Sequence, residues 1–317
     1  MPKVSVVIPV YGVEKYIERC SNSLFAQTLD DIEFIFVDDC TPDKSIVILE
    51  QIIEKNRHRL EEMSWTTRIV RMPTNSGLPA ARRQGIQLAT GDYVIHCDSD
   101  DWVEKDMYRA MYEKAIEENA DIVICDFQYH DGVNKLQHLE GLKDLKKDII
   151  DELLSHNLSW SLCNKLFKRS LYDGIIYPKG NMGEDFAQCM QMIIKSHRIS
   201  YIPKPFYNYF MNPGSISRVV TREQKLNNFY SNKSNIDIVL NMMAENDITE
   251  CHNAAIVAKK WGMKKRLFDI SPFDKSLWRE TYKEINKHVL FNRYISLRDK
   301  LFFILTYMGL YPKRIIE

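Results

Sequence analysis

The sequence predicts an α/β protein in which a mostly parallel sheet carries helices on both faces and a helical extension follows at the C-terminus. Two observations lead to this fold class. Up to about residue 128, short β-branched and aromatic runs alternate with amphipathic segments across short connections, which is typical of a parallel sheet covered on both sides. From about residue 221 the chain instead has helical periodicity without a repeat.

The first 128 residues supply strands and helices in turn. The run at 4–9 is apolar and β-branched and ends at a proline, which is typical of a strand. Apolar residues between 14 and 27 recur at helical spacing. Thr41-Pro42-Asp43 is typical of a helix start, with Thr41 as the N-cap and the proline in the first helical position. We expect further strands at 33–37, 69–72, 93–97 and 121–127, and further helices after 43, at 80–89 and at 107–118.

The remainder of the chain is predicted to be mainly helical. Helical segments at 142–156 and 184–196 flank strand-like pieces around Leu166 and at 199–202. We expect a first domain of residues 1–218, divided at 128, and a helical region of residues 219–317.

Composition excludes several classes of protein. The 317 residues carry 43 basic and 43 acidic side chains. The chain therefore lacks the net positive charge that would indicate a nucleic-acid-binding protein. Seven cysteines without a C-x-x-C pair indicate a reducing compartment rather than a disulfide or zinc framework. No stretch approaches the ~18 apolar residues of a membrane span, and the N-terminal apolar run is too short for a signal peptide. We expect a cytoplasmic protein, or one peripheral to the inner face of a membrane.

Acidic side chains follow two of the predicted strands. Asp98-Ser99-Asp100-Asp101 comes directly after the run at 93–97, and Asp38-Asp39 ends the run at 33–37. Carboxylates this close repel one another, and a divalent cation with a phosphate-bearing ligand is the usual reason for such a cluster. Both clusters are placed at the carboxyl ends of strands, where ligands bind in open α/β sheets. The alternatives are a polar turn capping a helix that starts near Glu104, and a polar loop end at Asp38-Asp39.

No glycine-rich phosphate-binding loop is present. Neither Gly-x-Gly-x-x-Gly nor a Walker-type Gly-Lys-Ser/Thr follows any predicted strand. A Mg²⁺ or Mn²⁺ ion on the acid cluster is the remaining way to hold a diphosphate.

A third acidic pair opens a predicted helix. The stretch Asn181 to Gly183 interrupts the regular secondary structure, and the apolar residues at 186–194 recur at helical spacing. Glu184 and Asp185 therefore fall in the first helical turn, where the helix dipole favours the charged form of a carboxylate. The alternative is a pair of ordinary capping residues.

Seven short motifs occur in order along the chain: Pro9-Val10-Tyr11, Val37-Asp38-Asp39, Asn75-x-Gly77 with Ala81-Arg82 and Gly85, Asp98-Ser99-Asp100-Asp101, Asn164-Lys165-Leu166, Gly183-Glu184-Asp185 and Ser215-Ile216-Ser217-Arg218. In this order and approximate spacing they resemble the motifs of family-two glycosyltransferases over about residues 3–218. The resemblance implies a GT-A fold, a nucleotide-sugar donor (most often UDP-linked), a divalent metal (Mn²⁺ or Mg²⁺) and inversion at the anomeric carbon. It also implies a glycan or lipid-linked acceptor in the synthesis of a cell-surface polysaccharide.

Site residues follow from the resemblance position by position. Asp39 would accept from uracil, Asp98 would contact the ribose, and Asp100 would ligate the metal. Asp185 would be the general base, with Glu184 beside it. Residues 1–128 would be the donor half and 129–218 the acceptor half. The donor-binding set is Pro9, Val10, Tyr11, Asp39, Asn75, Gly77, Arg82, Asp98, Ser99, Asp100 and Lys165.

The chain departs from the family pattern at four positions, Gly12, Cys40, Pro42 and Arg83. These differences bear on loop shape and on donor identity more than on activity. A GT-A domain that binds nucleotide or glycan without turnover is the alternative function. A nucleotidyltransferase would need a glycine- and arginine-rich loop, which residues 9–15 do not contain.

Aromatic and apolar groups in the second half have two interpretations each. Trp160 and the aromatic residues at 206–210 form either an acceptor-sugar platform or part of the core. The tail at 297–316 is an apolar stretch with basic flanks, which either lies in a membrane interface or packs on the body of the protein.

Overall fold

The computed structural model describes residues 1–310 apart from 132–133, 139, 141, 143–147, 179 and 213–220. Within that part of the chain the sheet has the strand order β3-β2-β1-β4-β8-β6-β9-β5, with β7 paired to β6. Its strands are β1 (Val4–Val10), β2 (Ile32–Asp38), β3 (Thr66–Arg71), β4 (Tyr93–His96), β5 (Trp102–Val103), β6 (Ile122–His130), β7 (Lys135–His138), β8 (Lys165–Lys168) and β9 (Ile199–Phe210).

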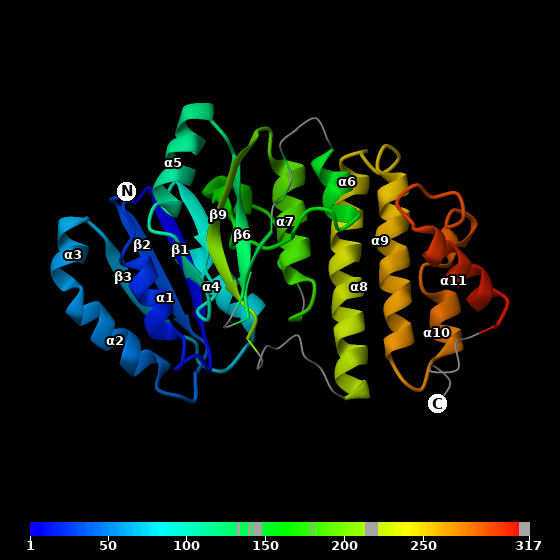
Figure 1. Cartoon of the computed structure of the whole chain (residues 1–317), viewed down its shortest axis with the longest axis horizontal. Helices are drawn as coiled ribbons and strands as arrows, with labels where there is room; N and C mark the ends of the chain where they lie inside the picture. Colours follow the sequence, from blue (N-terminus) through cyan, green and yellow to red (C-terminus); the bar gives the residue numbers. More distant parts are fainter. Residues whose placement is uncertain are drawn as a thin grey trace.

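Helices lie on both sides of this sheet and continue beyond it (Figure 1). They are α1 (Ile17–Leu24), α2 (Ser45–Lys55), α3 (Arg57–Glu62), α4 (Leu78–Leu88), α5 (Met107–Glu118), α6 (Ile149–Leu154), α7 (Glu184–Lys195), α8 (Arg222–Glu245), α9 (Asn253–Lys265), α10 (Lys275–Glu280) and α11 (Leu297–Tyr307). Short 3₁₀ segments are η1 (Arg169–Tyr172), η2 (Arg266–Asp269) and η3 (Lys283–Lys287).

The predicted α/β fold class is confirmed. Strands β1 to β4 are mutually parallel, with Val10 opposite Asp38 in neighbouring strands. Beyond β4 the sheet is mixed, because β8 runs antiparallel to both β4 and β6, while β9 returns parallel to β6.

Two hydrophobic cores cover the two faces of the sheet. Successive residues of a strand point to opposite faces, so Val7 packs into one core with α4 and α7, and Val6 packs into the other with α1, α2 and α5. The first core continues without a break into α8 and α9, which stand beside α7 in Figure 1. The helical C-terminal region is therefore packed on the side of the sheet that carries α4 and α7.

The predicted start of helix α2 is wrong. Helix α2 begins at Ser45, and Thr41 is not its N-cap; Asp43 instead accepts from the Ser45 amide at 3.0 Å. The acidic stretch leads into β5 and does not cap a helix near Glu104, so that alternative is wrong, and helix α5 starts at Met107 as predicted.

Strand β9 is much longer than the predicted strand at 199–202. Pro203 and Pro205 interrupt the expected pattern, since proline removes a ladder hydrogen bond, and irregular pairing with β6 near Cys125 and Asp126 accommodates them.

The helix predicted at 142–156 is only partly described, and there α6 covers Ile149–Leu154. The motif at Ser215–Arg218 and the boundary at 218 lie outside the described residues. Among the residues that the structure describes, no helix is both long and apolar enough to span a bilayer.

Candidate active site

The parallel pairing of β2, β1 and β4 brings the acidic clusters to one edge of the sheet. Asp38 ends β2 opposite Val10 of β1, and Asp98 follows β4, whose residue His96 pairs with Val7 of β1. The carboxyl ends of these strands therefore form a common rim, as the sequence predicts.

Arg82 of helix α4 joins carboxylates from two distant segments at this rim. Its Nη2 donates to Asp98 Oδ1 at 2.7 Å, and its Nη1 pairs with both Glu184 and Asp185 at the start of α7. The Arg82 side chain is only 1% exposed. A buried guanidinium requires such partners, because an uncompensated charge in the interior is costly. We call Arg82, Asp98, Glu184 and Asp185 the acidic centre.

The pKa values of the two acids of helix α7 are shifted in opposite directions. Burial raises the pKa of Glu184 well above its usual value against the opposing charge of Arg82, and the Asp185 carboxylate adds to the rise. Burial would also raise the pKa of Asp185, but the charge and hydrogen bond of Arg82, together with a hydrogen bond from Glu184, bring it below the usual value. Of the two, Glu184 is therefore protonated more readily, and Asp185 ionises more readily. The Asp185 side chain is 42% exposed and thus reachable by a substrate hydroxyl.

Asp100 lies two residues beyond Asp98 and is held from two sides. Asn212 Nδ2 donates to its Oδ2 at 3.0 Å, and Arg19 Nη2 donates to its main-chain carbonyl at 2.6 Å. Burial and the neighbouring Asp98 carboxylate raise the pKa of Asp100. Carboxylate oxygens of this kind fit Mn²⁺ or Mg²⁺.

A metal at this position would need ligands beyond the protein. Within the described residues, no group of three or more histidine, cysteine, aspartate or glutamate side chains could hold a metal ion. Asp100 would supply a carboxylate oxygen, and diphosphate oxygens of a nucleotide would be among the other ligands, as is common for Mg²⁺ sites.

Asp39 anchors the loop that carries Asn75 and Gly77. Its two carboxylate oxygens accept from the Ser76 amide at 2.7 Å and the Gly77 amide at 2.8 Å. Gly77 has a φ of +84°, and a Cβ there would lie 2.6 Å from Asn181 Oδ1. The structure thus brings the motif Val37-Asp38-Asp39 together with Asn75-x-Gly77, and places both beside Asn181, just before the motif Gly183-Glu184-Asp185.

The first motif lies along the same rim. Ser99 Oγ donates to the Pro9 carbonyl at 2.6 Å, while Val10 is buried and Tyr11 is exposed at the end of β1.

Lys165 is placed differently from these rim residues. Its fully buried Nζ donates to the carbonyls of Ser159 and Ser161 at 2.8 and 2.9 Å and to Asn164 Oδ1 at 2.9 Å. The ammonium group therefore holds the 159–164 segment together.

Sequence analysis missed residues that support Asp100. The Arg19 guanidinium stacks 3.9 Å from the centre of the Trp102 ring while it holds the Asp100 carbonyl. Asp101 accepts from Tyr207 Oη at 2.5 Å and from the Phe210 amide at 2.7 Å. A single arginine in an amphipathic helix carries no sequence signal, and the partners from β9 are about a hundred residues away.

Several side chains near the rim are buried and belong to the core. His96 is buried and bonded to Tyr172 Oη at 3.0 Å, and Cys97 is a buried thiol whose pKa is raised. Phe206 and Tyr207 are core residues, whereas Tyr209 is 36% exposed.

Comparison with known proteins identifies the family of this chain. The sequence model described as Glycosyl transferase family 2 matches residues 5–176, which is more than half of the chain. The chain belongs to glycosyltransferase family 2. This family-two chain is 30% identical over 233 residues to glycosyltransferase GlyA of Streptococcus pneumoniae, covering 70% of this chain and 32% of the relative. It is 30% identical over 229 residues to the uncharacterized glycosyltransferase EpsJ of Bacillus subtilis, covering 69% and 64%.

Solved structures confirm the GT-A fold of this family-two chain. The crystal structure of residues 1–349 of TarS from S. aureus with UDP-GlcNAc superimposes with a TM-score of 0.60 at 18% identity, covering 98% of this chain and 93% of that one. A mannosyltransferase from Pyrobaculum calidifontis with GDP-Man and Mn²⁺ gives a TM-score of 0.58 at 13% identity, covering 99% and 82%.

Proposed function

We propose that this family-two protein is an inverting glycosyltransferase that moves a sugar from a nucleotide-sugar donor, UDP-linked, to a glycan or lipid-linked acceptor in cell-surface polysaccharide synthesis. The observation that carries the proposal is the convergence of Asp98, Asp100 and Asp185 at one rim, with Arg82 joining two of them. These carboxylates come from two segments that are far apart along the chain. A fold that only binds a nucleotide would not need the second segment, which carries Asp185.

The donor would lie along the ends of β1, β2 and β4. Asp39 has both oxygens in use on the 75–77 loop, but each carboxylate oxygen retains a second lone pair for a base N–H. Asp98 would accept from the ribose. The similar TarS structure contains UDP-GlcNAc, which supports a UDP-linked donor.

Asp185 would act as the base. Its ionised carboxylate accepts the proton of the acceptor hydroxyl as that oxygen attacks the anomeric carbon opposite the leaving diphosphate. Arg82 fixes the carboxylate through Oδ1, and Glu184, whose pKa is raised, stays beside it as a hydrogen-bonding partner. A divalent cation bound at Asp100 would supply positive charge to the leaving diphosphate.

A thermal-shift panel of nucleotides and nucleotide sugars, with and without Mn²⁺, tests the donor site. We expect UDP and at least one UDP-sugar to raise the melting temperature only when Mn²⁺ is present, because ligand binding to the folded state stabilises it. Asp100→Asn should remove that shift, and Asp121→Asn, which changes a carboxylate bonded to residues 197 and 198, should retain it. Indifference to every nucleotide would contradict a donor site, and binding without hydrolysis or transfer would favour a non-catalytic module.

Domain roles follow from the same assignment. Residues 1–128 would bind the donor, residues 129–218 would face the acceptor, and residues 219–317 would form a helical region. All three are part of the proposal, because the chain spans only 32% and 64% of the two curated relatives described above.

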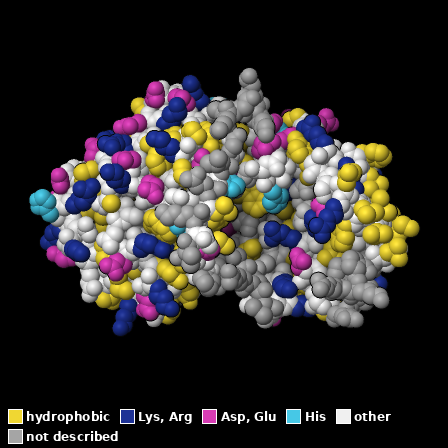
Figure 2. All heavy atoms as spheres, in the orientation of Figure 1, with side chains coloured by type: hydrophobic (Ala, Val, Ile, Leu, Met, Phe, Trp, Pro, Cys, Tyr) yellow, Lys and Arg dark blue, Asp and Glu magenta, His cyan; other side chains and the backbone are white. Residues whose placement is uncertain are grey.

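Helix α11 would provide a peripheral membrane contact. Phe303 packs against Trp261 with ring centres 5.5 Å apart, but Leu297, Leu301 and Met308 are 83%, 57% and 69% exposed. Hydrophobic side chains gather on this edge of the molecule in Figure 2. The structure thus gives the helix one packed face and one uncovered apolar face, which is typical of an interfacial helix.

Co-sedimentation with phosphatidylglycerol vesicles tests this contact. Replacing both Leu297 and Met308 by serine should weaken vesicle binding by about tenfold or more, since burying each apolar side chain is worth about 1.5–3 kcal/mol. Ile116→Ser, which changes an exposed apolar residue of α5, is the matched control. Equal binding of all three proteins would remove α11 from this role.

A further inference from the structure

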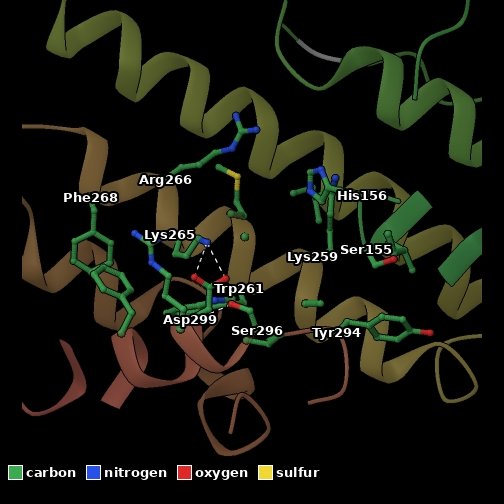
Figure 3. A pocket seen from close by; sticks show the side chains of 18 of the residues that line it. Ser155, His156, Lys259, Trp261, Lys265, Arg266, Phe268, Tyr294, Ser296 and Asp299 are labelled. Carbon is green, nitrogen blue, oxygen red and sulfur yellow. Dashed lines mark hydrogen bonds and ion pairs between the residues drawn. The ribbon is translucent and has the colours of Figure 1, made fainter. Parts of the chain in front are cut away.

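A cavity of about 1190 Å³ lies on the far side of helix α7 from the sheet, between α8, α9, α11 and the segment after α6. Figure 3 shows Lys259 and His156 towards one end of the view, the Lys265–Asp299 pair near the middle and Phe268 at the opposite end. None of the carboxylates of the acidic centre, and none of the predicted donor-binding residues, lines it. The cavity is therefore separate from the donor site.

Positive side chains outnumber negative ones in this cavity. The basic residues in its lining are Lys259, Lys265, Arg266 and Arg298, against the two acids Asp269 and Asp299. Lys265 Nζ is paired with Asp299 at 2.9 Å. Arg266 and Arg298 have no ion pair within the part of the chain that the structure describes. The field of these charges is evident at His156, whose pKa is lowered to about 3 by burial and by the charges of Lys259, Arg266 and Lys265.

Lys259 has an environment that lacks an anion. Its side chain is only 4% exposed, and its Nζ lies 3.5 Å from the centre of the Trp160 ring and 3.6 Å from that of Phe186. Ring faces attract a cation but offer no hydrogen-bond acceptor for the three N–H donors of an ammonium group. Among the described residues, no acceptor and no carboxylate pairs with Lys259 Nζ. Burial and the charge of Arg266 hold its pKa well below the usual value.

Because the pKa of Lys259 is lowered, its amine is fully protonated only when an anion lies beside it, and the described residues place no carboxylate there. A lone buried cation costs several kcal/mol unless it is paired, and Lys259 faces a cavity that Arg266 and Arg298 also line from other elements. A phosphate group has enough oxygens to accept from several such donors at once. The aromatic and apolar walls, which include Trp261, Phe302 and Leu305, suit an organic substituent on that phosphate.

We propose that this cavity is a binding site for the phosphate group of an organic phosphate, with Lys259 as its innermost ligand and Arg266 and Arg298 at its entrance. The site goes beyond the proposed transfer reaction and does not depend on it. Lys259 contacts Phe186 of helix α7, and Phe186 directly follows the predicted base Asp185. The cavity therefore lies next to the helix that carries that base.

Tryptophan fluorescence measures occupancy directly, since Trp160 and Trp261 both line the cavity. The full chain is titrated with inorganic phosphate, glycerol 3-phosphate and dihexanoyl phosphatidic acid, with glycerol and dihexanoyl phosphatidylcholine as the matched probes without a phosphate monoester. We expect saturable changes with the phosphate monoesters only. Saturation by phosphatidic acid alone would identify a lipid phosphate as the source, and saturation by glycerol 3-phosphate as well would identify a soluble or polymer-borne phosphate.

Two neighbouring lysines of α9 localise the effect. Lys259→Met should weaken phosphate binding at least tenfold, because a hydrogen bond to a charged group is lost. Lys260→Met changes a side chain that is paired with Glu284 at 2.7 Å and does not line the cavity, so it should leave the dissociation constant unchanged. The melting temperature of Lys259→Met should not fall, since the variant replaces a buried amine that has no hydrogen-bond acceptor among the described residues by an apolar side chain. No saturable binding of any phosphate monoester, or equal affinities of the two variants, would overturn the proposal.

Discussion

Asp185→Asn is expected to lower the rate of sugar transfer by about 10²–10⁴-fold, the usual range for loss of a general base. The amide cannot accept the proton of the acceptor hydroxyl, yet it keeps the size of the side chain beside Arg82. Transfer is measured as UDP release with acceptor, and binding of UDP with Mn²⁺ is measured separately by calorimetry. We expect kcat to fall while the affinity for UDP stays within about twofold.

The pH profile adds an independent check on Asp185. Because Arg82 holds the pKa of Asp185 below its usual value, the base remains ionised throughout the neutral range. The rate should therefore keep its plateau and decline only as the pH falls through that depressed value. Asp173→Asn, which changes an exposed carboxylate after η1, should leave rate and profile unchanged. A variant at Asp185 that retains full transfer would exclude it as the base.

Arg82→Met is expected to destabilise the protein by about 3–5 kcal/mol at neutral pH, because removing one partner of a buried ion pair leaves uncompensated charge. Here the remaining partners are three carboxyl groups, of Asp98, Glu184 and Asp185. The free energy of unfolding is measured with urea. Arg83→Met, in which an exposed neighbour stacks on Tyr177, serves as the control and should cost less than about 1 kcal/mol.

The loss in Arg82→Met should shrink as the pH falls. In the native protein the depressed pKa of Asp185 contributes stability above its unfolded pKa, and this contribution disappears as pH falls through the folded value. Without Arg82 that contribution is absent, and protonation of the carboxyl groups relieves their repulsion. A difference in unfolding free energy that stays constant from pH 7 to well below 3.8, the unfolded pKa of an aspartate, would contradict the role of Arg82 as their counter-ion.

Local pattern was sufficient for the elements that form the rim. The largely apolar runs of β1, β2 and β4 mark strands buried on both faces. The acids at the ends of β2 and β4 had to meet at one edge once the strands were parallel. Helix α5 was predicted at its observed bounds, Met107–Glu118, because its periodicity is clear and it is bounded by polar residues.

Contacts between distant segments could not be predicted in the same way. Arg82 is about a hundred residues away from its partners Glu184 and Asp185 along the chain. The local sequence around either segment does not predict a contact with the other. Lys165 shows the same limit, since only the fold reveals that its ammonium group is enclosed by the carbonyls of Ser159 and Ser161. Arg19 remained undetected because its stacking on Trp102 depends on how α1 meets β5.

The central claim is a division of labour at one rim, in which Asp100 serves the donor diphosphate and Asp185 serves the acceptor hydroxyl. Calorimetric titration of UDP with Mn²⁺ into the Asp100→Asn and Asp185→Asn variants measures this division most directly. We predict that Asp100→Asn abolishes binding and that Asp185→Asn binds as the unaltered protein does. Unchanged binding by Asp100→Asn, or loss of binding in both variants alike, would contradict the account.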